Sequence, residues 1–303
     1  MKIIDAHTHF SNIAAFHYAA ETSGVDFSYD GLINEQAENE IVASVCMGLI
    51  EMKPGLFPDK SAPAFMCAFC PGELNDNYAE LHFGKLPPLR MHEDCPDNMH
   101  VCIGVNPHNL DDESVNAMRI LTKSPGARIV GFKIYAGYYH FSINDPVYTP
   151  VYKLAAERGL TVAIHTGDTY AETALLEYSH PLAADRLAVN FRDVNFMLCH
   201  MGDPWIMDAC EVAYKNRNVY LDISGLLAGD AAHIAATQER HLAMHHYAQG
   251  LQYLNQFDKV LFGTDWPLVP LGAYIEFCKK LIPVSSYDDV FFNNAVKLFG
   301  LKI

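Results

Sequence analysis

Eight short apolar segments separated by helical patterns are the feature that most constrains how this chain can fold. They lie at residues 3–9, 41–50, 100–105, 129–135, 160–165, 194–200, 219–224 and 259–265. Most are apolar throughout instead of alternating with polar residues, as is typical of parallel strands buried on both faces. Because helical patterns alternate with them, the sequence predicts an α/β fold. Eight such units predict a closed (β/α)8 barrel, also called a TIM barrel.

The stretches between these segments complete the predicted architecture. A loop is expected over residues 11–30, and helices are expected over 31–40, 111–123, 147–158, 181–191, 204–216, 231–256, 271–281 and 288–298. Residues 52–99 break this rhythm and hold seven of the sixteen prolines, so they are predicted to form a long insertion that covers the site. No domain boundary is visible, and residues 1–303 are predicted to form a single domain.

Composition limits the partners of this chain. Its 21 basic and 36 acidic residues give a net charge of −15, which disfavours nucleic acid and anionic membranes. No apolar run approaches the length of a transmembrane helix, and we expect no signal peptide before the first segment. The eight cysteines are scattered, as suits reduced thiols. We expect a cytoplasmic protein with a small-molecule partner; a homo-oligomer is compatible with the sequence.

Two histidines end the first segment. Strict alternation along a strand would place His7 and His9 on the same face, together with Asp5. Two neighbouring imidazoles at the end of a buried strand can share a metal ion. The pattern therefore predicts the start of a metal site at this end of the barrel.

Other ligand-type residues end later segments. His165 ends the fifth and His200 the sixth, Asp265 ends the eighth, and Lys133 lies late in the fourth. Each one alone is compatible with a satisfied core histidine or a helix-capping aspartate. Barrels of this type carry their functional groups at the carboxyl ends of the strands, and buried polar groups need partners, so we expect these side chains to converge.

Six motifs resemble those of the amidohydrolase superfamily. The nearest resemblance is to its branch of metal-dependent TIM-barrel hydrolases related to aminocarboxymuconate semialdehyde decarboxylase. The motifs are Ile-Asp-Ala-His7-Thr-His9-Phe, Gly131-Phe-Lys133, Ile164-His165-Thr-Gly-Asp168, Cys199-His200-Met-Gly-Asp203, Phe262-Gly-Thr-Asp265-Trp-Pro and Asn294-Ala-x-x-Leu-Phe-Gly300. They span nearly the whole chain in the expected order.

The resemblance implies a divalent metal ion, usually zinc, bound by His7, His9, His165 and Asp265. It also implies that His200 is the acid/base or carbonyl-polarising residue. Imidazole and carboxylate ligands suit Zn²⁺, with Mn²⁺ and Fe²⁺ as alternatives. Such a metal lowers the pKa of a bound water to about 7. Asp265 would accept the proton of that water, and His200 would stabilise an oxyanion or protonate the leaving group.

Lys133 bears on the number of metal ions. Binuclear members of the superfamily carboxylate a strand-four lysine to bridge two metals, whereas one ion suffices in the decarboxylase-like branch. The motif match favours one metal per chain, with Lys133 as an unmodified, inward-pointing cation that contributes to catalysis. The alternative is a lysine that merely pairs with a barrel carboxylate.

The leading functional prediction is a metal-dependent hydrolase that cleaves a C–N or C–O bond of a small organic molecule with a metal-activated water. The alternative is a non-oxidative decarboxylase, which must bind a carboxylate. No arginine directly follows a strand, so only Lys133 or Arg90 is available for that task. A non-catalytic metal-binding protein is the third reading, and the open coordination position with its adjacent base argues against it.

Three weaker signals complete the list. His241 and His245 are spaced for one face of a helix, without the glutamate of a zinc-protease motif, and favour a solvated face. Cys67 and Cys70 are compatible with a structural zinc or with ordinary thiols. Aromatic side chains follow several strand ends and predict a wall around the substrate. They are Tyr135, Tyr138, Tyr139, His140, Tyr170, Trp205 and Trp266.

Overall fold

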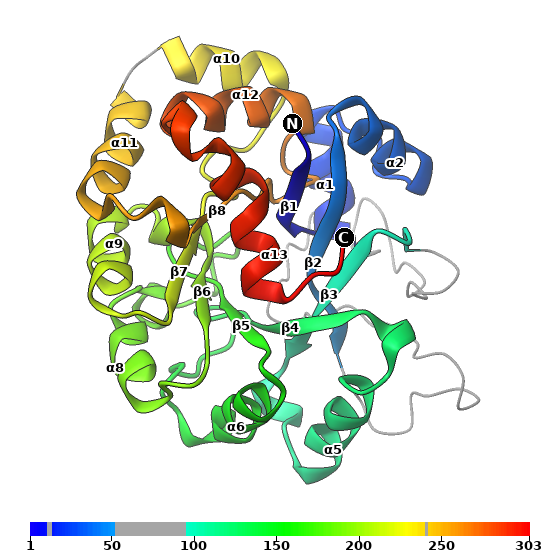
Figure 1. Ribbon diagram of the computed structural model, residues 1–303, viewed down its shortest axis with the longest axis vertical. Coiled ribbons are helices and arrows are strands. Elements are labelled where there is room, and N and C mark those ends of the chain that lie inside the picture. Colours follow the sequence, from blue (N-terminus) through cyan, green and yellow to red (C-terminus); the bar gives the residue numbers. More distant parts are fainter. Residues whose placement is uncertain (11–13, 52–94, 240–241) are drawn as a thin grey trace.

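The computed structural model describes residues 1–10, 14–51, 95–239 and 242–303, and it contains the predicted barrel (Figure 1). Eight strands form one sheet in sequence order, and neighbouring strands from β1 to β8 are all parallel. The sheet returns from β8 to β1 through the carbonyl of Phe262, which accepts from the amide of Ala6 at 2.9 Å, and through a parallel bridge between Thr8 and Trp266. The predicted α/β fold and TIM barrel are confirmed.

The strands agree in order and position with the eight apolar segments. They are β1 Ile3–Thr8, β2 Ile41–Glu51, β3 Met99–Val105, β4 Ile129–Ile134, β5 Thr161–Ile164, β6 Phe196–Leu198, β7 Val219–Asp222 and β8 Val260–Leu261. The helices are α1 Ala14–Ser23, α2 Tyr29–Glu38, α5 Asp112–Leu121, α6 Thr149–Arg158, α7 Leu176–Ser179, α8 Ala183–Asn190, α9 Ile206–Lys215, α10 Ala231–Glu239, α11 Leu242–Leu254, α12 Leu271–Leu281 and α13 Asn294–Phe299. Two of these helices show typical capping residues. Asp111 caps the start of α5 by accepting from the Ser114 amide at 2.8 Å, and α6 ends at Gly159 with a φ of 64°.

The structure differs most from the predicted elements in two regions. The region expected to be a loop over residues 11–30 contains α1, an alanine-rich helix. The long helix expected over residues 231–256 is divided into α10 and α11, with residues 240–241 outside the described part. Residues 52–94 of the predicted insertion also lie outside the described residues. That the whole chain forms one domain stays a prediction.

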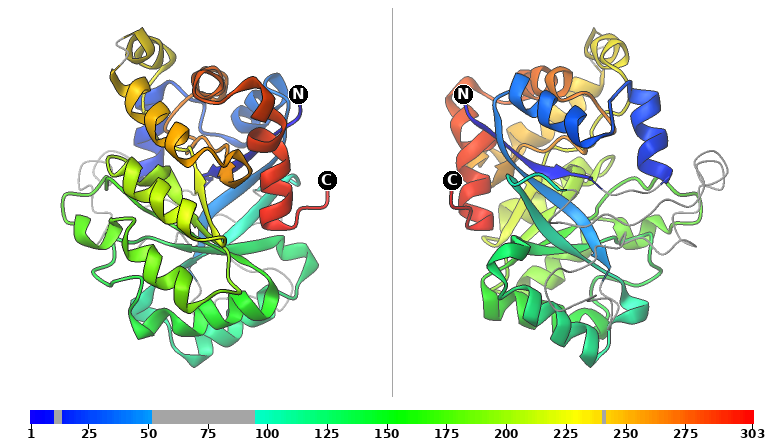
Figure 2. Two further views of the ribbon diagram at one scale, coloured as in Figure 1. Left: turned by 60° about the vertical axis from the view of Figure 1, so that its left-hand side comes forward. Right: turned by 90° about the vertical axis from the view of Figure 1, so that its right-hand side faces the viewer.

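The two ends of the barrel are built differently. Inside the sheet, small and medium apolar side chains such as Val45, Ala163 and Leu261 continue into Leu298 and Phe299 of α13, which cover the end where the strands begin. The hydroxyl of Thr161, the first residue of β5, donates to the carbonyl of Leu298 at 2.9 Å. In the right-hand view of Figure 2, α13 (red) and α1 (blue) lie at opposite ends of the strands. Helix α1 therefore lies at the end where the carboxyl termini of the strands meet.

Outside the sheet, the helices cover a continuous apolar layer that includes Phe132, Phe196 and Phe262.

Within the described residues, no helix combines the length and apolarity needed to cross a lipid bilayer.

Candidate active site

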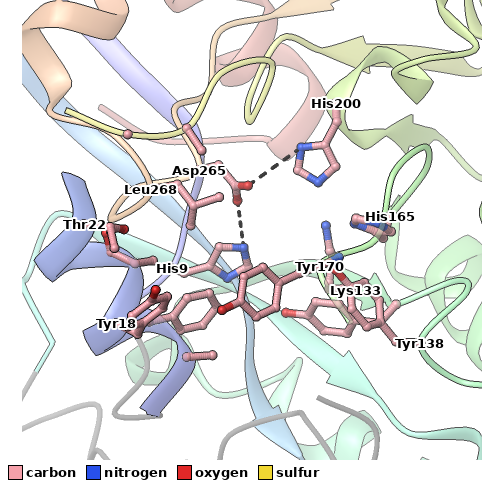
Figure 3. Close-up of a pocket in the computed structure, with 16 residues that line it drawn as sticks. His9, Tyr18, Thr22, Lys133, Tyr138, His165, Tyr170, His200, Asp265 and Leu268 are labelled. Carbon is pink, nitrogen blue, oxygen red and sulfur yellow. Dashed lines mark hydrogen bonds and ion pairs between the residues drawn. The ribbon is translucent and has the colours of Figure 1, made fainter. Parts of the chain in front are cut away.

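The cavity lies at the carboxyl ends of the strands, where the sequence predicts the functional groups (Figure 3). Its volume is about 180 Å³. Phe16 and Tyr18 of α1 contribute aromatic side chains to its wall, and the ring of Phe16 stacks on that of His9 at 4.5 Å. Lys133, His165, His200 and Asp265 bring polar groups into the same cavity. A cavity with an apolar, aromatic wall and a few convergent polar groups is typical of sites for small organic molecules.

A bulge in β1 determines which residues of the first motif reach the site. The register against β2 shifts between Asp5 and Thr8, so strict alternation does not hold there. Asp5 is paired with Ser44 and accepts hydrogen bonds from the hydroxyl and amide of Thr264 at 2.5 and 3.0 Å. The expectation that Asp5 shares a face with His7 and His9 is therefore wrong, because the bulge resets the alternation after it. His7 and His9 both reach the site.

The hydrogen bonds of the two histidines leave one nitrogen of each ring open toward Asp265. His7 places Nδ1 2.8 Å from Oδ2 of Asp222, and His9 places Nδ1 3.2 Å from the carbonyl of Met47. A carboxylate and a carbonyl only accept, so in the neutral form of each ring Nδ1 carries the proton and Nε2 presents a lone pair.

The lone pairs face a carboxylate oxygen. Oδ1 of Asp265 lies 3.2 Å from Nε2 of His7 and 2.9 Å from Nε2 of His9. Among the described residues, Oδ1 of Asp265 and Nε2 of His7 are both buried, and neither atom has a hydrogen-bond partner. Three lone pairs that converge in a buried place repel one another unless a cation lies between them. The donor set therefore fits a divalent metal ion.

The surrounding charges favour the same conclusion. Burial lowers the pKa of His7, but neighbouring carboxylates such as Asp222 outweigh it and hold the pKa well above its usual value. Burial raises the pKa of Asp265, but the imidazoles of His7 and His200 outweigh it and keep the carboxylate ionised. This place in the protein thus attracts positive charge, as a proton or as a metal ion.

His200 lies beside this cluster, on the turn that follows β6. Its backbone has a φ of 62°, and its amide donates to Oδ1 of Asp222 at 2.9 Å. Its ring lies 4.9 Å from that of His7, with Nδ1 4.0 Å from Oδ2 of Asp265. Burial lowers the pKa of His200 to about 4. Gly225 makes this approach possible, because a Cβ there would meet Nδ1 of His200 at 2.7 Å and Oδ2 of Asp265 at 2.8 Å.

His165 takes a different position from the other predicted ligands. It lines the cavity, with its ring 4.9 Å from that of His200, and its Nε2 donates to the carbonyl of Asp168 at 2.8 Å. Its Nδ1 then carries the lone pair. In the described part of the chain, no ion pair links His165 to Asp265, and its role as a fourth ligand stays a prediction.

Comparison with known proteins identifies the family. A family model described as amidohydrolase matches residues 4–301. The chain belongs to the amidohydrolase family. Membership confirms the resemblance seen in the motifs and makes the chain an enzyme of this superfamily. Among proteins of curated function, none matches the sequence.

Solved structures similar to this amidohydrolase include both hydrolases and decarboxylases. A probable 2-pyrone-4,6-dicarboxylic acid hydrolase from Acinetobacter baumannii is 16% identical, with a TM-score of 0.59 over 99% of this chain and 100% of that chain. A 2,6-dihydroxybenzoate decarboxylase from Rhizobium is 13% identical, with a TM-score of 0.62 over 99% of both chains. An amidohydrolase from Burkholderia multivorans with bound zinc is 14% identical, with a TM-score of 0.59 over both full chains. At these identities the likeness supports the barrel fold alone.

Lys133 of this amidohydrolase points inward, as its place in β4 predicts (Figure 3). Its side chain is fully buried, and its ammonium donates to Sγ of Cys199 at 2.9 Å and lies 5.4 Å from the ring centre of Tyr135. No carboxylate of the described residues forms an ion pair with it. The alternative in which Lys133 merely pairs with a barrel carboxylate therefore has no support among these residues.

The sequence predictions missed Asp222 and Ser224, at the end of β7. Asp222 accepts from Nδ1 of His7 and from the amide of His200, and Ser224 lies with its hydroxyl 3.0 Å from Nδ1 of both histidines. The sequence does contain a signal for Asp222: it is a carboxylate that ends an apolar strand segment at the functional end of the barrel. The apolar run from Val219 to Ser224 predicts only a strand.

The weaker signals have different outcomes. Tyr135, Tyr138 and Tyr170 line the cavity, whereas Trp205 packs against His180 and Trp266 is fully buried. His245 lies on α11 and contacts Gln249 at 2.9 Å near the surface, while His241 falls outside the described residues. Cys67 and Cys70 also fall outside them.

Proposed function

We propose that this amidohydrolase hydrolyses a C–N or C–O bond of a small organic molecule, with one divalent metal ion at the cluster of His7, His9 and Asp265. The observation that carries the proposal is the convergence of two Nε2 lone pairs and one carboxylate oxygen on a buried point beside the cavity. His165, which lines the same cavity, is the proposed fourth ligand. Zn²⁺ is the favoured ion, because it binds imidazole and carboxylate in this proportion at catalytic sites.

A metal ion bound there would polarise a carbonyl group and lower the pKa of water to about 7. The protein supplies the rest of the chemistry. Asp265 keeps an ionised carboxylate at the cavity, so that its oxygen can accept a proton from attacking water. His200 lies beside it and transfers the proton to or from the reacting group. The side chains of His200 and Asp265 are only 12% and 10% exposed, so little bulk water reaches the groups that carry out these steps.

The cavity supports a small-molecule substrate. Tyrosine and phenylalanine side chains form its apolar wall, which can pack against a flat ring or chain. The acidic chain, with a net charge of −15, gives no support for nucleic-acid or membrane partners. A cytoplasmic location and assembly into a homo-oligomer belong to the same proposal and rest on the sequence.

One observation favours decarboxylation as a second candidate. Lys133 places a fully buried ammonium group at the cavity, within reach of a thiol and a tyrosine ring but without a carboxylate partner among the described residues. A buried cation of this kind can bind a carboxylate of the substrate. Two similar structures are named for small carboxylic acids, one as a hydrolase and one as a decarboxylase. Binding a carboxylate at Lys133 is compatible with either reaction.

The reaction type can be tested with one panel of compounds. Zinc-loaded enzyme is incubated with small lactones, esters and amides that carry a carboxylate, and with the matching hydroxybenzoic acids. The proposal expects acid release with one ¹⁸O atom from labelled water in the product, and no carbon dioxide. Carbon dioxide release from the acids, without hydrolysis of any ester, lactone or amide, would show that the second candidate is correct. The His7→Ala variant serves as the control for contaminating activity.

A further inference from the structure

Asp222 contacts His7 of the proposed metal cluster, and its carboxylate has four hydrogen-bond donors around it. Its Oδ2 faces Nδ1 of His7 at 2.8 Å. Its Oδ1 accepts from the amide of His200 at 2.9 Å, the amide of Ser224 at 3.0 Å and the hydroxyl of Ser224 at 2.5 Å. The side chain is fully buried. A buried carboxylate is retained only where such donors compensate for its lost hydration.

These contacts assign the proton of the Ser224 hydroxyl. A serine hydroxyl has one proton and two acceptor sites. The shortest contact of Oγ is the 2.5 Å contact with Asp222, an oxygen that can only accept, so the proton lies there. Oγ must then act as an acceptor toward Nδ1 of His200, which lies 3.0 Å away.

The position of the proton on the His200 ring follows from its hydrogen-bond acceptors in the same way. Its Nδ1 also lies 3.1 Å from the carbonyl of Ser224, a second group that only accepts. In a neutral ring, Nδ1 therefore carries the hydrogen and Nε2 carries the lone pair. Figure 3 shows the second nitrogen of His200 turned into the cavity, toward the side of Lys133.

We infer that Asp222 and Ser224 are positioning residues: Asp222 fixes the proton on Nδ1 of His7 directly, and through the hydroxyl of Ser224 it fixes the proton on Nδ1 of His200. One carboxylate thus prepares the metal ligand and the proton-transfer residue together: Nε2 of His7 is free to bind the metal, and Nε2 of His200 is free to accept a proton. His200 begins the reaction as a base and becomes an acid only after it has received that proton. The inference rests on the proposed function for the metal at His7 and for the role it gives to His200.

The variant Asp222→Asn tests the link to the metal. An amide NH₂ facing Nδ1 of His7 would favour the tautomer with hydrogen on Nε2, where the metal should bind. Loss of an outer partner of this kind typically lowers metal affinity about 10- to 100-fold. The measurement is the zinc dissociation constant from competition with a chromophoric chelator, without any substrate. Asp185→Asn is the matched control, since this carboxylate accepts from Lys215 and Asn216 far from the cavity. Equal zinc affinity in all three proteins would overturn the inference.

Ring tautomers can be observed directly, also if Asp222→Asn does not fold. Zinc-loaded wild-type protein labelled with ¹⁵N in histidine is studied by long-range ¹H–¹⁵N correlation spectra. The expected result is a protonated Nδ1 in both His7 and His200; hydrogen on Nε2 of His200 would refute the assignment. In Ser224→Ala, we expect near-normal zinc affinity with lower kcat and little change in KM, and Ser224→Thr should restore part of kcat. The spectra and the zinc affinities need no turnover. They can therefore refute the positioning role of Asp222 and Ser224 even if the enzyme hydrolyses a substrate, and they can support that role even if no hydrolysis is found.

Discussion

The two ends of this barrel share the same strands but contain different kinds of side chain. At the end where the strands begin, apolar residues such as Leu298 and Phe299 of α13 continue the interior core. At the end where the strands finish, buried His7, His9 and Asp265 bring their lone pairs together. The first arrangement is favourable by itself, because burial of apolar surface stabilises the fold. The second costs stability unless a ligand compensates, which is what a functional site requires.

A buried lysine at each end makes the contrast specific. Lys259 lies just before β8, and its ammonium donates to the carbonyl of Ala213 at 2.6 Å and to that of Asn216 at 2.9 Å, at the last turn of α9. It completes the end of a helix, where a positive charge is favourable. Lys133 has a thiol as its hydrogen-bond acceptor at the cavity. Lys259 thus has two backbone carbonyl acceptors in the fold, whereas Lys133 has a thiol acceptor and, among the described residues, no carboxylate partner.

Removal of the two histidines of β1 should have the largest effect at the open end of the barrel. We expect the double variant His7→Ala with His9→Ala to lose its bound metal, because two of the converging donors are gone. Elemental analysis of protein purified without chelator should give one divalent ion per wild-type chain and almost none in the variant. Equal metal in both proteins, or two ions per wild-type chain, would contradict the proposed site.

Asp265→Asn should separate metal binding from proton transfer at the same end. An amide cannot accept a proton at neutral pH, so kcat should fall about 10²- to 10⁴-fold even in protein shown to contain metal. The measurement is kcat at saturating metal, with the metal content of the same sample as its control. A metal-replete variant with near-normal kcat would remove Asp265 from the mechanism.

Leu298→Ala is the corresponding change at the closed end. Truncating this buried side chain should lower the free energy of unfolding by about 2–5 kcal/mol, since it removes apolar contacts and leaves a cavity. Metal content and kcat of the folded protein should stay at wild-type values. Urea unfolding followed by circular dichroism measures the first, and assays below the transition measure the second. A variant of normal stability that loses its metal would show that the two ends are not separable.

Sequence predicts the arrangement of strands well because local patterns determine it. Apolar segments identify the strands, and the barrel then places His7, His9, His200 and Asp265 at one end without further information. Helix α1 escaped prediction for a local reason. Its residues are mostly alanine and aromatic, with no acidic residue in the first turn and no basic residue in the last.

Contacts between distant segments could not be predicted in this way. Asp222 meets His7 across 215 residues of sequence, and an aspartate that ends a strand looks the same whether it caps a helix or orients a ligand. The bulge after Asp5 is equally invisible, because it depends on register against β2 and not on residue type. Alternation therefore placed His7 and His9 side by side, as they are in the structure with ring centres 5.2 Å apart, but it assigned Asp5 to the wrong face.

The smallest expected effects come from the two buried lysines, Lys259 at the closed end and Lys133 at the cavity. Lys259→Met should lower the free energy of unfolding by about 1–3 kcal/mol, because helix-end carbonyls lose a charged donor, and should leave KM unchanged. Lys133→Met should keep or raise stability, because it removes a buried charge without a carboxylate partner, while KM for a carboxylate substrate rises about 10- to 100-fold. Urea midpoints and KM values for both variants form a two-by-two test. If Lys133→Met destabilised the fold and left KM unchanged, Lys133 would be structural like Lys259, and the cavity would have to bind its substrate without it.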